Sequence, residues 1–145
     1  PNTALNPSDW AMRGLTPYQD LPENGLAKLI LPAGIQGPKF MVFENYTALL
    51  AYNPGQAYAL SVCALGDAIA GGLGLVQPWP IGEAALSRDE KRNVQIALSA
   101  LGYDTFGADG LMGPNTAAAL WRYQRDQGYV SDAYLSRALW AELAG

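Results

Sequence analysis

A stretch rich in glycine and proline divides the chain of 145 residues, and this division limits the possible folds more than any other feature of the sequence. Residues 71–86 read "GGLGLVQPWPIGEAAL", and the apolar periodicity of the preceding residues stops there. We predict a linker over residues 73–86, an N-terminal unit over residues 1–72 and a C-terminal unit over residues 87–145. Both units are small, so the stability of each depends on a few core residues.

Composition excludes several classes of function. Hydrophobic residues make up 50% of the chain and charged residues 15%, which is enough apolar material for a globular core. The net charge of -4 provides no basic surface, so we expect no nucleic-acid partner and no binding to an anionic membrane surface. Because the chain has no histidine, Ser-His and Cys-His nucleophile pairs and the usual zinc ligand sets are excluded, and we expect neither a metal nor a cofactor.

The single cysteine, Cys63, lies in the apolar run "YALSVCALGDAIA". We predict a packed, unreactive thiol because no neighbour in the sequence would favour its thiolate, and one thiol supplies no disulfide framework. The run from Tyr58 to Ala70 is shorter than the roughly 20 apolar residues that cross a bilayer. It therefore predicts a core helix and no transmembrane segment.

The N-terminal unit is predicted to combine short helices with a β-hairpin. "NPSDWAMRGL" indicates a helix that is capped by Ser8 and ended by Gly14. Two β-rich runs, "GLAKLILPAG" and "GPKFMVFEN", predict a short antiparallel pair. Helices are expected from Asn45 to the "NPG" at residues 53–55, and from there to about Ala70. One stripe of the second helix is expected to be core: Tyr58, Val62, Leu65 and Ile69.

The C-terminal unit is predicted to be a three-helix bundle. The predicted fold class is therefore mainly α with a small β-hairpin, an α+β lobe followed by the bundle. Ser87 is placed to cap the first helix and Gly113-Pro114 to start the second, while the third is expected to begin near residue 131 or 134. The predicted core residues are Val94, Leu98, Leu101, Thr116, Leu120, Tyr123, Gln127, Leu135, Leu139 and Leu143.

Residues 108–124, "ADGLMGPNTAAALWRYQ", place a tryptophan near two glycine turns. Trp121 points about 140° from the centre of its helix's apolar stripe, so we expect it to be at least partly exposed. An exposed indole beside a turn rich in backbone amides suits a glycan or glycopeptide. Two alternatives stay open: Trp121 packs on the other unit or on Trp79, and Asp109 only holds its own turn. Calcium is not expected, because Phe and Ala stand between Asp104 and Asp109 where oxygen ligands are needed.

The C-terminal unit resembles the peptidoglycan-binding domain type 1 family, a three-helix cell-wall module. Six features carry the resemblance: Leu101-Gly102-Tyr103, Asp109-Gly110, Gly113-Pro114, Thr116, Tyr123-Gln124 and Gly128. One position departs from the family, which often has Asp-Gly in this stretch, because Asp132 is followed here by Ala133. The turn before the last helix is therefore a place where the structure can differ.

The N-terminal unit resembles the end of the catalytic domain of the membrane-bound lytic murein transglycosylase B type. The resembling residues are Trp10, Gly14 and the run "LPAGIQGPKFMVFENYTALLAYNPGQAYALSVCALGDAIAGG", followed by "PWP" in the order typical of the family. The resemblance implies cleavage of MurNAc-GlcNAc bonds without water. One glutamic acid protonates the leaving oxygen and then, as carboxylate, assists closure of a 1,6-anhydro ring.

The family's catalytic glutamate lies upstream of the matched part, so the resemblance implies that this chain holds no catalytic residue. None of its glutamates replaces that residue: Glu23, Glu44, Glu83, Glu90 and Glu142. We predict a chain that is inactive alone and whose parent is a lytic transglycosylase; the alternative is a non-catalytic scaffold protein that binds peptidoglycan. An independent hydrolase that uses Asp9, Asp20 or Glu23 is not expected, because their spacing supports no pair of carboxylates across a cleft.

Six residues are predicted to bind the substrate: Tyr52, Asn53, Tyr103, Asp109, Asn115 and Trp121. Tyr52-Asn53 matches the family's Tyr-Asn pair on the floor of the substrate cleft; the alternative is that Asn53 simply ends a helix before Pro54. The expected partners are the glycan strands and stem peptides of peptidoglycan. We expect a monomer in the periplasm, anchored to the outer membrane through a part that precedes Pro1.

Overall fold

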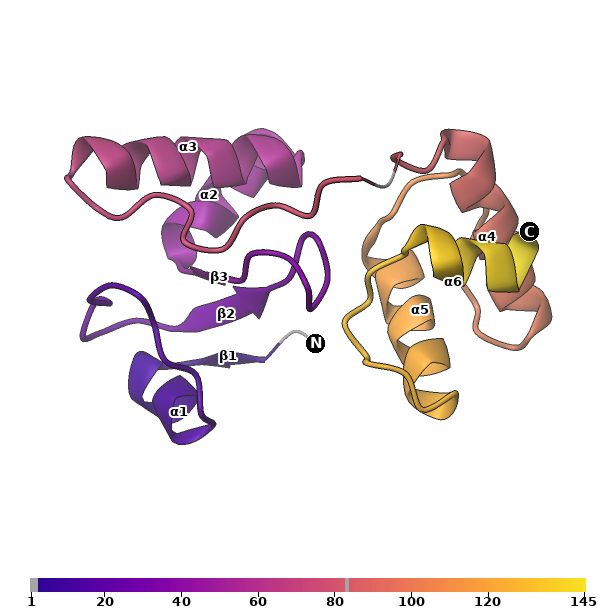
Figure 1. The fold of residues 1–145 in the computed structure, drawn as a ribbon, viewed down its shortest axis with the longest axis horizontal. Coiled ribbons are helices and arrows are strands. Elements are labelled where there is room, and N and C mark those ends of the chain that lie inside the picture. The colour runs from indigo at the N-terminus through magenta and orange to yellow at the C-terminus, as the bar shows by residue number, and fades with distance from the viewer. Residues whose placement is uncertain (1–2, 83) are drawn as a thin grey trace. The chain divides into compact units, whose positions relative to one another are not determined.

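The computed structural model of the chain describes residues 3–82 and 84–145; Pro1, Asn2 and Glu83 lie outside the described residues. Helices predominate beside a small antiparallel sheet, which confirms the predicted fold class (Figure 1).

Contacts divide the described chain into two compact units. One contains residues 3–30 and 38–78, and the other contains residues 31–37, 79–82 and 84–145. The first unit holds the sheet and three helices, and the second holds three further helices. The predicted linker at residues 73–86 and the domain limits on either side of it stay predictions.

The sheet of the first unit has three antiparallel strands in the order β1-β2-β3: Ala4–Leu5, Ala27–Ile30 and Phe40–Val42. The predicted antiparallel pair corresponds to β2 and β3, in which Leu29 lies opposite Met41. We did not predict β1, because a strand of two residues shows no alternation. Helix α1, Pro7–Met12, lies at the β1 edge, and the Trp10 indole donates a hydrogen bond to the Ala27 carbonyl at 2.9 Å (Figure 1).

The predicted cap of α1 is wrong by two residues. Asn6 is the N-cap, and its Oδ1 accepts from the Asp9 backbone N–H at 2.8 Å. Ser8 instead lies in the first turn and donates its hydroxyl proton to Asn6 Oδ1 at 2.7 Å. With Pro7 at the first helical position, which has no N–H to satisfy, the helix begins two residues earlier than Ser8 would place it.

Helices α2, Glu44–Tyr52, and α3, Gln56–Ile69, confirm the two predicted helices and the break between them. The predicted core stripe of α3 is wrong. Tyr58, Val62, Leu65 and Ile69 are all exposed, Ile69 to 80%, whereas the core of this unit is formed by Val42, Tyr46, Ala59 and Leu60. Since α3 is apolar on nearly every side, its periodicity cannot decide which stripe faces the sheet.

The half-buried Cys63 packs against this same core. Burial, followed by the nearby Asp67 carboxylate, raises the pKa of its thiol. The raised pKa favours the protonated thiol at neutral pH, which agrees with the predicted packed thiol.

The second unit forms the predicted three-helix bundle from α4, Arg88–Ala100, α5, Pro114–Asp126, and α6, Arg137–Ala144. Ser87 caps α4 with a complete capping box, and Gly113 and Pro114 begin α5, as predicted. The core confirms six predicted residues, Val94, Leu98, Leu120, Tyr123, Leu135 and Leu139, and Thr116 is buried beside them.

Three other predicted core residues in this unit are less buried than expected. Leu101 is 58% exposed, because α4 ends at Ala100 and Leu101 only caps it. Gln127 caps α5 and is exposed, while Gln124 is buried in its place. Leu143 is only half-buried. Helix α6 begins at Arg137, later than predicted, because its cap is Ser136, whose hydroxyl accepts from the Leu139 N–H.

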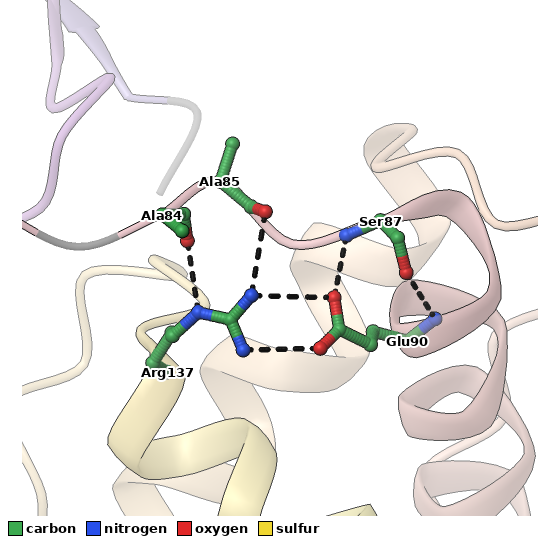
Figure 2. A network of polar contacts seen from close by, with 5 residues as sticks. All are labelled: Ala84, Ala85, Ser87, Glu90 and Arg137. Atoms are coloured by element: carbon green, nitrogen blue, oxygen red, sulfur yellow. Dashed lines mark hydrogen bonds and ion pairs between the residues drawn. The ribbon is translucent and has the colours of Figure 1, made fainter.

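A network around Arg137 joins the start of α6 to the start of α4 (Figure 2). The guanidinium forms an ion pair with Glu90 at 3.0 Å and donates from Nε to the Ala84 carbonyl at 2.9 Å. A longer contact, 3.5 Å, reaches the Ala85 carbonyl. The same Glu90 carboxylate accepts from the Ser87 backbone N–H at 2.6 Å. The backbone just before α4 is thus held against the bundle.

Candidate functional site

The loop between α4 and α5 is built around a glycine that no other residue can replace without rearrangement. Gly110 has a φ of 76°, in the left-handed region that favours glycine. A Cβ at this position would also collide with the backbone carbonyl of Arg88. The Asp109-Gly110 pair therefore lets the loop pack directly on the first turn of α4.

One buried amide side chain holds this loop in place. Gln95 is 1% exposed, and its Nε2 donates to the Leu111 carbonyl and the Thr116 hydroxyl, each at 2.9 Å, and to Asp109 Oδ1 at 3.1 Å. Its Oε1 accepts from the Gly110 N–H at 2.7 Å. Gln95 thereby joins α4, the loop and the first turn of α5.

The Asp109 carboxylate is part of the same arrangement. Its Oδ1 also accepts from the Leu111 N–H at 2.8 Å. This backbone hydrogen bond, followed by the one from Gln95, lowers the pKa of Asp109 below its ordinary value. Asp109 therefore holds its own turn as a fixed negative charge, whatever further role it has.

A groove of about 230 Å³ lies along this loop. Its lining is largely polar or small and consists of Gln95, Thr105, Phe106, Gly107, Asp109, Leu111, Gly113, Pro114, Asn115 and Thr116. Among the described residues, the exposed Asn115 amide has no hydrogen-bond partner, unlike Gln95 and Asp109. Two of the predicted site residues, Asp109 and Asn115, thus meet in one groove.

The other two predicted site residues of this unit lie outside the groove. Tyr103 packs edge-to-face on Tyr123, with ring centroids 5.5 Å apart, and donates its hydroxyl proton to Asp126 at 3.2 Å. Trp121 is half-buried, and the Arg125 guanidinium lies 5.3 Å from the centre of its ring. That cation–π contact covers part of the indole and leaves the rest accessible.

The Tyr52-Asn53 pair lies in the first unit, at the end of α2. Tyr52 is 83% exposed. Asn53 caps α2, and its Oδ1 accepts from the Gly55 N–H at 2.9 Å. The Asn53 side chain thus shapes the break before α3, and its predicted contact with substrate stays a prediction.

The turn before α6 keeps a left-handed residue although the glycine is missing. Ala133 has a φ of 58°. Its N–H donates to Gln124 Oε1 at 2.8 Å, while Asp132 Oδ1 accepts from the Tyr134 N–H and from Gln124 Nε2, each at 2.9 Å. The buried Gln124 side chain imposes the turn, so alanine occupies a conformation that glycine usually supplies.

Sequence reasoning missed several residues of the groove, among them Gln95 and Phe106. Gln95 precedes Leu98 by three positions and shares its face of α4, so a polar residue on an apolar stripe was the available indication. Phe106 is 75% exposed at the groove's rim and has a φ of 58°, for which the sequence gives no indication.

Neither a membrane-spanning helix nor a group of three potential metal ligands is found in residues 3–82 and 84–145.

Comparison with family sequence models matches both units. Residues 2–67 match the transglycosylase SLT domain, and residues 87–143 match a putative peptidoglycan binding domain. The chain therefore joins a segment related to lytic transglycosylases to a peptidoglycan-binding domain.

Among solved structures, the chain is similar to SltB3 from Pseudomonas aeruginosa. The complex of SltB3 with NAG-anhNAM-pentapeptide is 35% identical over 99% of this chain and 40% of SltB3, with a TM-score of 0.88. The complex of SltB3 with NAG-NAM-pentapeptide is 36% identical over 97% of this chain and 39% of SltB3, with a TM-score of 0.88. The chain thus spans about two fifths of SltB3. No curated protein matched the chain.

Proposed function

We propose that the chain is the peptidoglycan-binding and targeting portion of a lytic transglycosylase of the membrane-bound B type, with residues 1–72 forming the end of the catalytic domain. The observation that carries this proposal is the similarity to SltB3 across both units, at 35% identity over 99% of the chain. The SltB3 complex contains an anhydro sugar, NAG-anhNAM-pentapeptide, which is the kind of product that the proposed reaction gives.

The catalytic glutamate of this proposal precedes residue 1. A general acid for this chemistry needs an enclosed carboxyl with a raised pKa. Glu23 and Glu44 are exposed. Glu90 has a lowered pKa, because it accepts from the Ser87 N–H and then from Arg137. The Glu142 carboxylate accepts from the hydroxyls of Tyr123 and Tyr129. Glu83 lies outside the described residues, so the structure neither supports nor opposes a catalytic role for it.

The binding role is tested by co-sedimentation of the full chain with purified sacculi. We expect the chain to pellet, and Asn115→Ala to pellet less, because its amide is the unpartnered polar group of the groove. Gln127→Ala removes an exposed amide at the far end of α5 and should pellet like the original chain. Failure of the original chain to pellet at every salt concentration would refute the proposal.

The catalytic part is tested separately, by digesting sacculi with the chain and separating the soluble products. We expect no 1,6-anhydromuropeptides from the chain alone, and their release from a longer protein that includes the upstream part of the catalytic domain. Release by the 145-residue chain would show that one of its own carboxyls is catalytic.

In a longer enzyme, the second unit would act by concentrating the catalytic domain near its polymer. Peptidoglycan is long and repetitive, so even a weak contact raises the local concentration of the next bond to be cleaved. We place this activity in the periplasm, with an outer-membrane anchor outside the chain, since the proposed substrate is located there.

A further inference from the structure

Phe106 stands on the rim of the groove in a conformation that is costly for a bulky residue. Its φ of 58° lies in the left-handed region, and its side chain is 75% exposed. Such a backbone costs roughly 1–2 kcal/mol for a residue with a Cβ, and an exposed ring recovers little of this by burial. Glycine would fit the turn without this cost.

The backbone on both sides of Phe106 is held firmly. Its own N–H donates to Asp104 Oδ1 at 2.7 Å. The preceding residue, Thr105, is 4% exposed and donates its hydroxyl proton to the Gly107 carbonyl at 2.8 Å. The ring is therefore presented outward from a fixed base.

The groove beside the apolar Phe106 ring is lined by polar side chains that differ in how they can bind a ligand. The amide of Gln95 is occupied by the loop and by Thr116, so it forms a fixed floor. Asn115 provides an accessible amide that can donate and accept. Asp109 keeps a negative charge in the groove, which disfavours a ligand carboxylate at that point.

An aromatic face beside neutral hydrogen-bonding groups fits a sugar ring. A pyranose has an apolar C–H face that stacks on an aromatic ring and polar groups around its edge. The volume, about 230 Å³, lies below the roughly 300–1,000 Å³ of pockets for drug-sized ligands, so one ring fits better than a disaccharide. The carboxylates of a stem peptide fit this charge pattern less well.

We propose that Phe106 is a stacking platform for one N-acetylhexosamine ring of the glycan strand, whose polar edge is bound by Asn115 in the adjoining groove. This inference rests on the proposed peptidoglycan-binding function and assigns the glycan, rather than the stem peptide, to this groove.

The test compares the full chain with its Phe106→Gly variant on two probes: glycan strands stripped of peptides by an amidase, and a soluble stem tetrapeptide. Affinity is measured by NMR titration. Phe106→Gly should bind the stripped strands about two- to tenfold more weakly, the range expected for one aromatic stacking contact. Because glycine relaxes the turn, this variant should also unfold at a higher temperature, so weaker binding cannot come from misfolding.

Two further variants complete the test. Ala133→Gly relaxes the other non-glycine residue with a positive φ in the described part of the chain; it lies outside the groove, and the variant should bind like the original chain. Phe106→Tyr keeps an aromatic face and should retain binding. Unchanged affinity of Phe106→Gly for stripped strands, or a Phe106-dependent shift with the tetrapeptide only, would overturn the platform while leaving wall binding intact. Loss of sacculus binding by the original chain would overturn the proposed function itself.

Discussion

At the scale of single residues, two amide side chains hold the loops of the second unit. Gln95 fixes the loop before α5, and Gln124 fixes the turn before α6 through Asp132 and the Ala133 N–H. Both side chains are buried and bonded at both ends of the amide. Each therefore acts through hydrogen bonds that an apolar residue of similar size would lose.

Gln95→Leu should destabilise the second unit by roughly 2–4 kcal/mol, because it leaves the Gly110 N–H and the Thr116 hydroxyl without their buried partner. Urea unfolding measures the change. The control is Gln127→Leu, at an exposed position, for which we expect a change of less than about 0.5 kcal/mol. Similar stability of the two variants would contradict the role of the Gln95 amide.

Ala133→Gly should raise the stability of the second unit by about 0.5–1 kcal/mol, since it removes left-handed strain at some cost in unfolded-state entropy. The matched substitution is Ala118→Gly, in the exposed middle of α5, which should lower stability by about 0.5–1 kcal/mol. Thermal unfolding of the two variants measures whether stability rises for Ala133→Gly and falls for Ala118→Gly. A decrease for Ala133→Gly would mean that the turn carries no strain.

At the scale of elements, two tyrosines, Tyr123 of α5 and Tyr129 just after it, connect α5 to α6 through the Glu142 carboxylate. The Tyr123 hydroxyl donates to Glu142 Oε1 at 2.7 Å, and the Tyr129 hydroxyl donates to the same carboxylate at 3.0 Å. Burial, followed by the Glu142 hydrogen bond, raises the pKa of Tyr123 to about 12. Folding therefore favours the protonated phenol at the junction of the two helices.

This raised pKa predicts a loss of stability at high pH. The contribution of Tyr123 is complete below its unfolded-state pKa of about 10 and disappears as the pH rises through the folded-state pKa of about 12. Urea midpoints between pH 9 and 12 should therefore fall less steeply for Tyr123→Phe than for the original chain. Tyr18→Phe, at a position that is 71% exposed, should leave the slope unchanged. Parallel slopes for all three proteins would contradict the prediction.

At the scale of the whole molecule, the first unit leaves one side of α3 uncovered. The exposed residues form the stripe that the sequence predicted to be core: Tyr58, Val62, Leu65 and Ile69. A contiguous exposed apolar surface of this kind usually marks a site of contact with another protein surface. Under the proposed function, the upstream part of the catalytic domain would cover this stripe; the predicted monomeric state stays a prediction.

The chain by itself should therefore associate weakly through α3 as its concentration rises. Leu65→Lys with Ile69→Lys should reduce this association, and sedimentation velocity over a range of concentrations measures it. Ile96→Lys, on the exposed side of α4, is the control and should leave the association unchanged. A chain that stays monomeric at every concentration would show that the stripe is too small to drive contact.

The sequence predicted those features that depend on neighbouring residues. The Ser87 capping box and the Gly113-Pro114 start of α5 follow from local hydrogen bonding and proline geometry. It could not predict which side of α3 is buried, because that depends on Val42 and Tyr46 from other elements. For the groove, Asp109 and Asn115 were found through their turn, while Phe106 was missed because its exposure depends on how the loop folds.

The Arg137 network also decides where a protease can separate the two parts of the sequence. A protease must draw the backbone that it cuts into its own cleft, and the Ala84 and Ala85 carbonyls are already engaged by the guanidinium. We expect nicking at the exposed residues Ile81 and Gly82, which would release a fragment that keeps the Arg137 network. Arg137→Ala would let the nick move toward α4, where it would shorten the fragment.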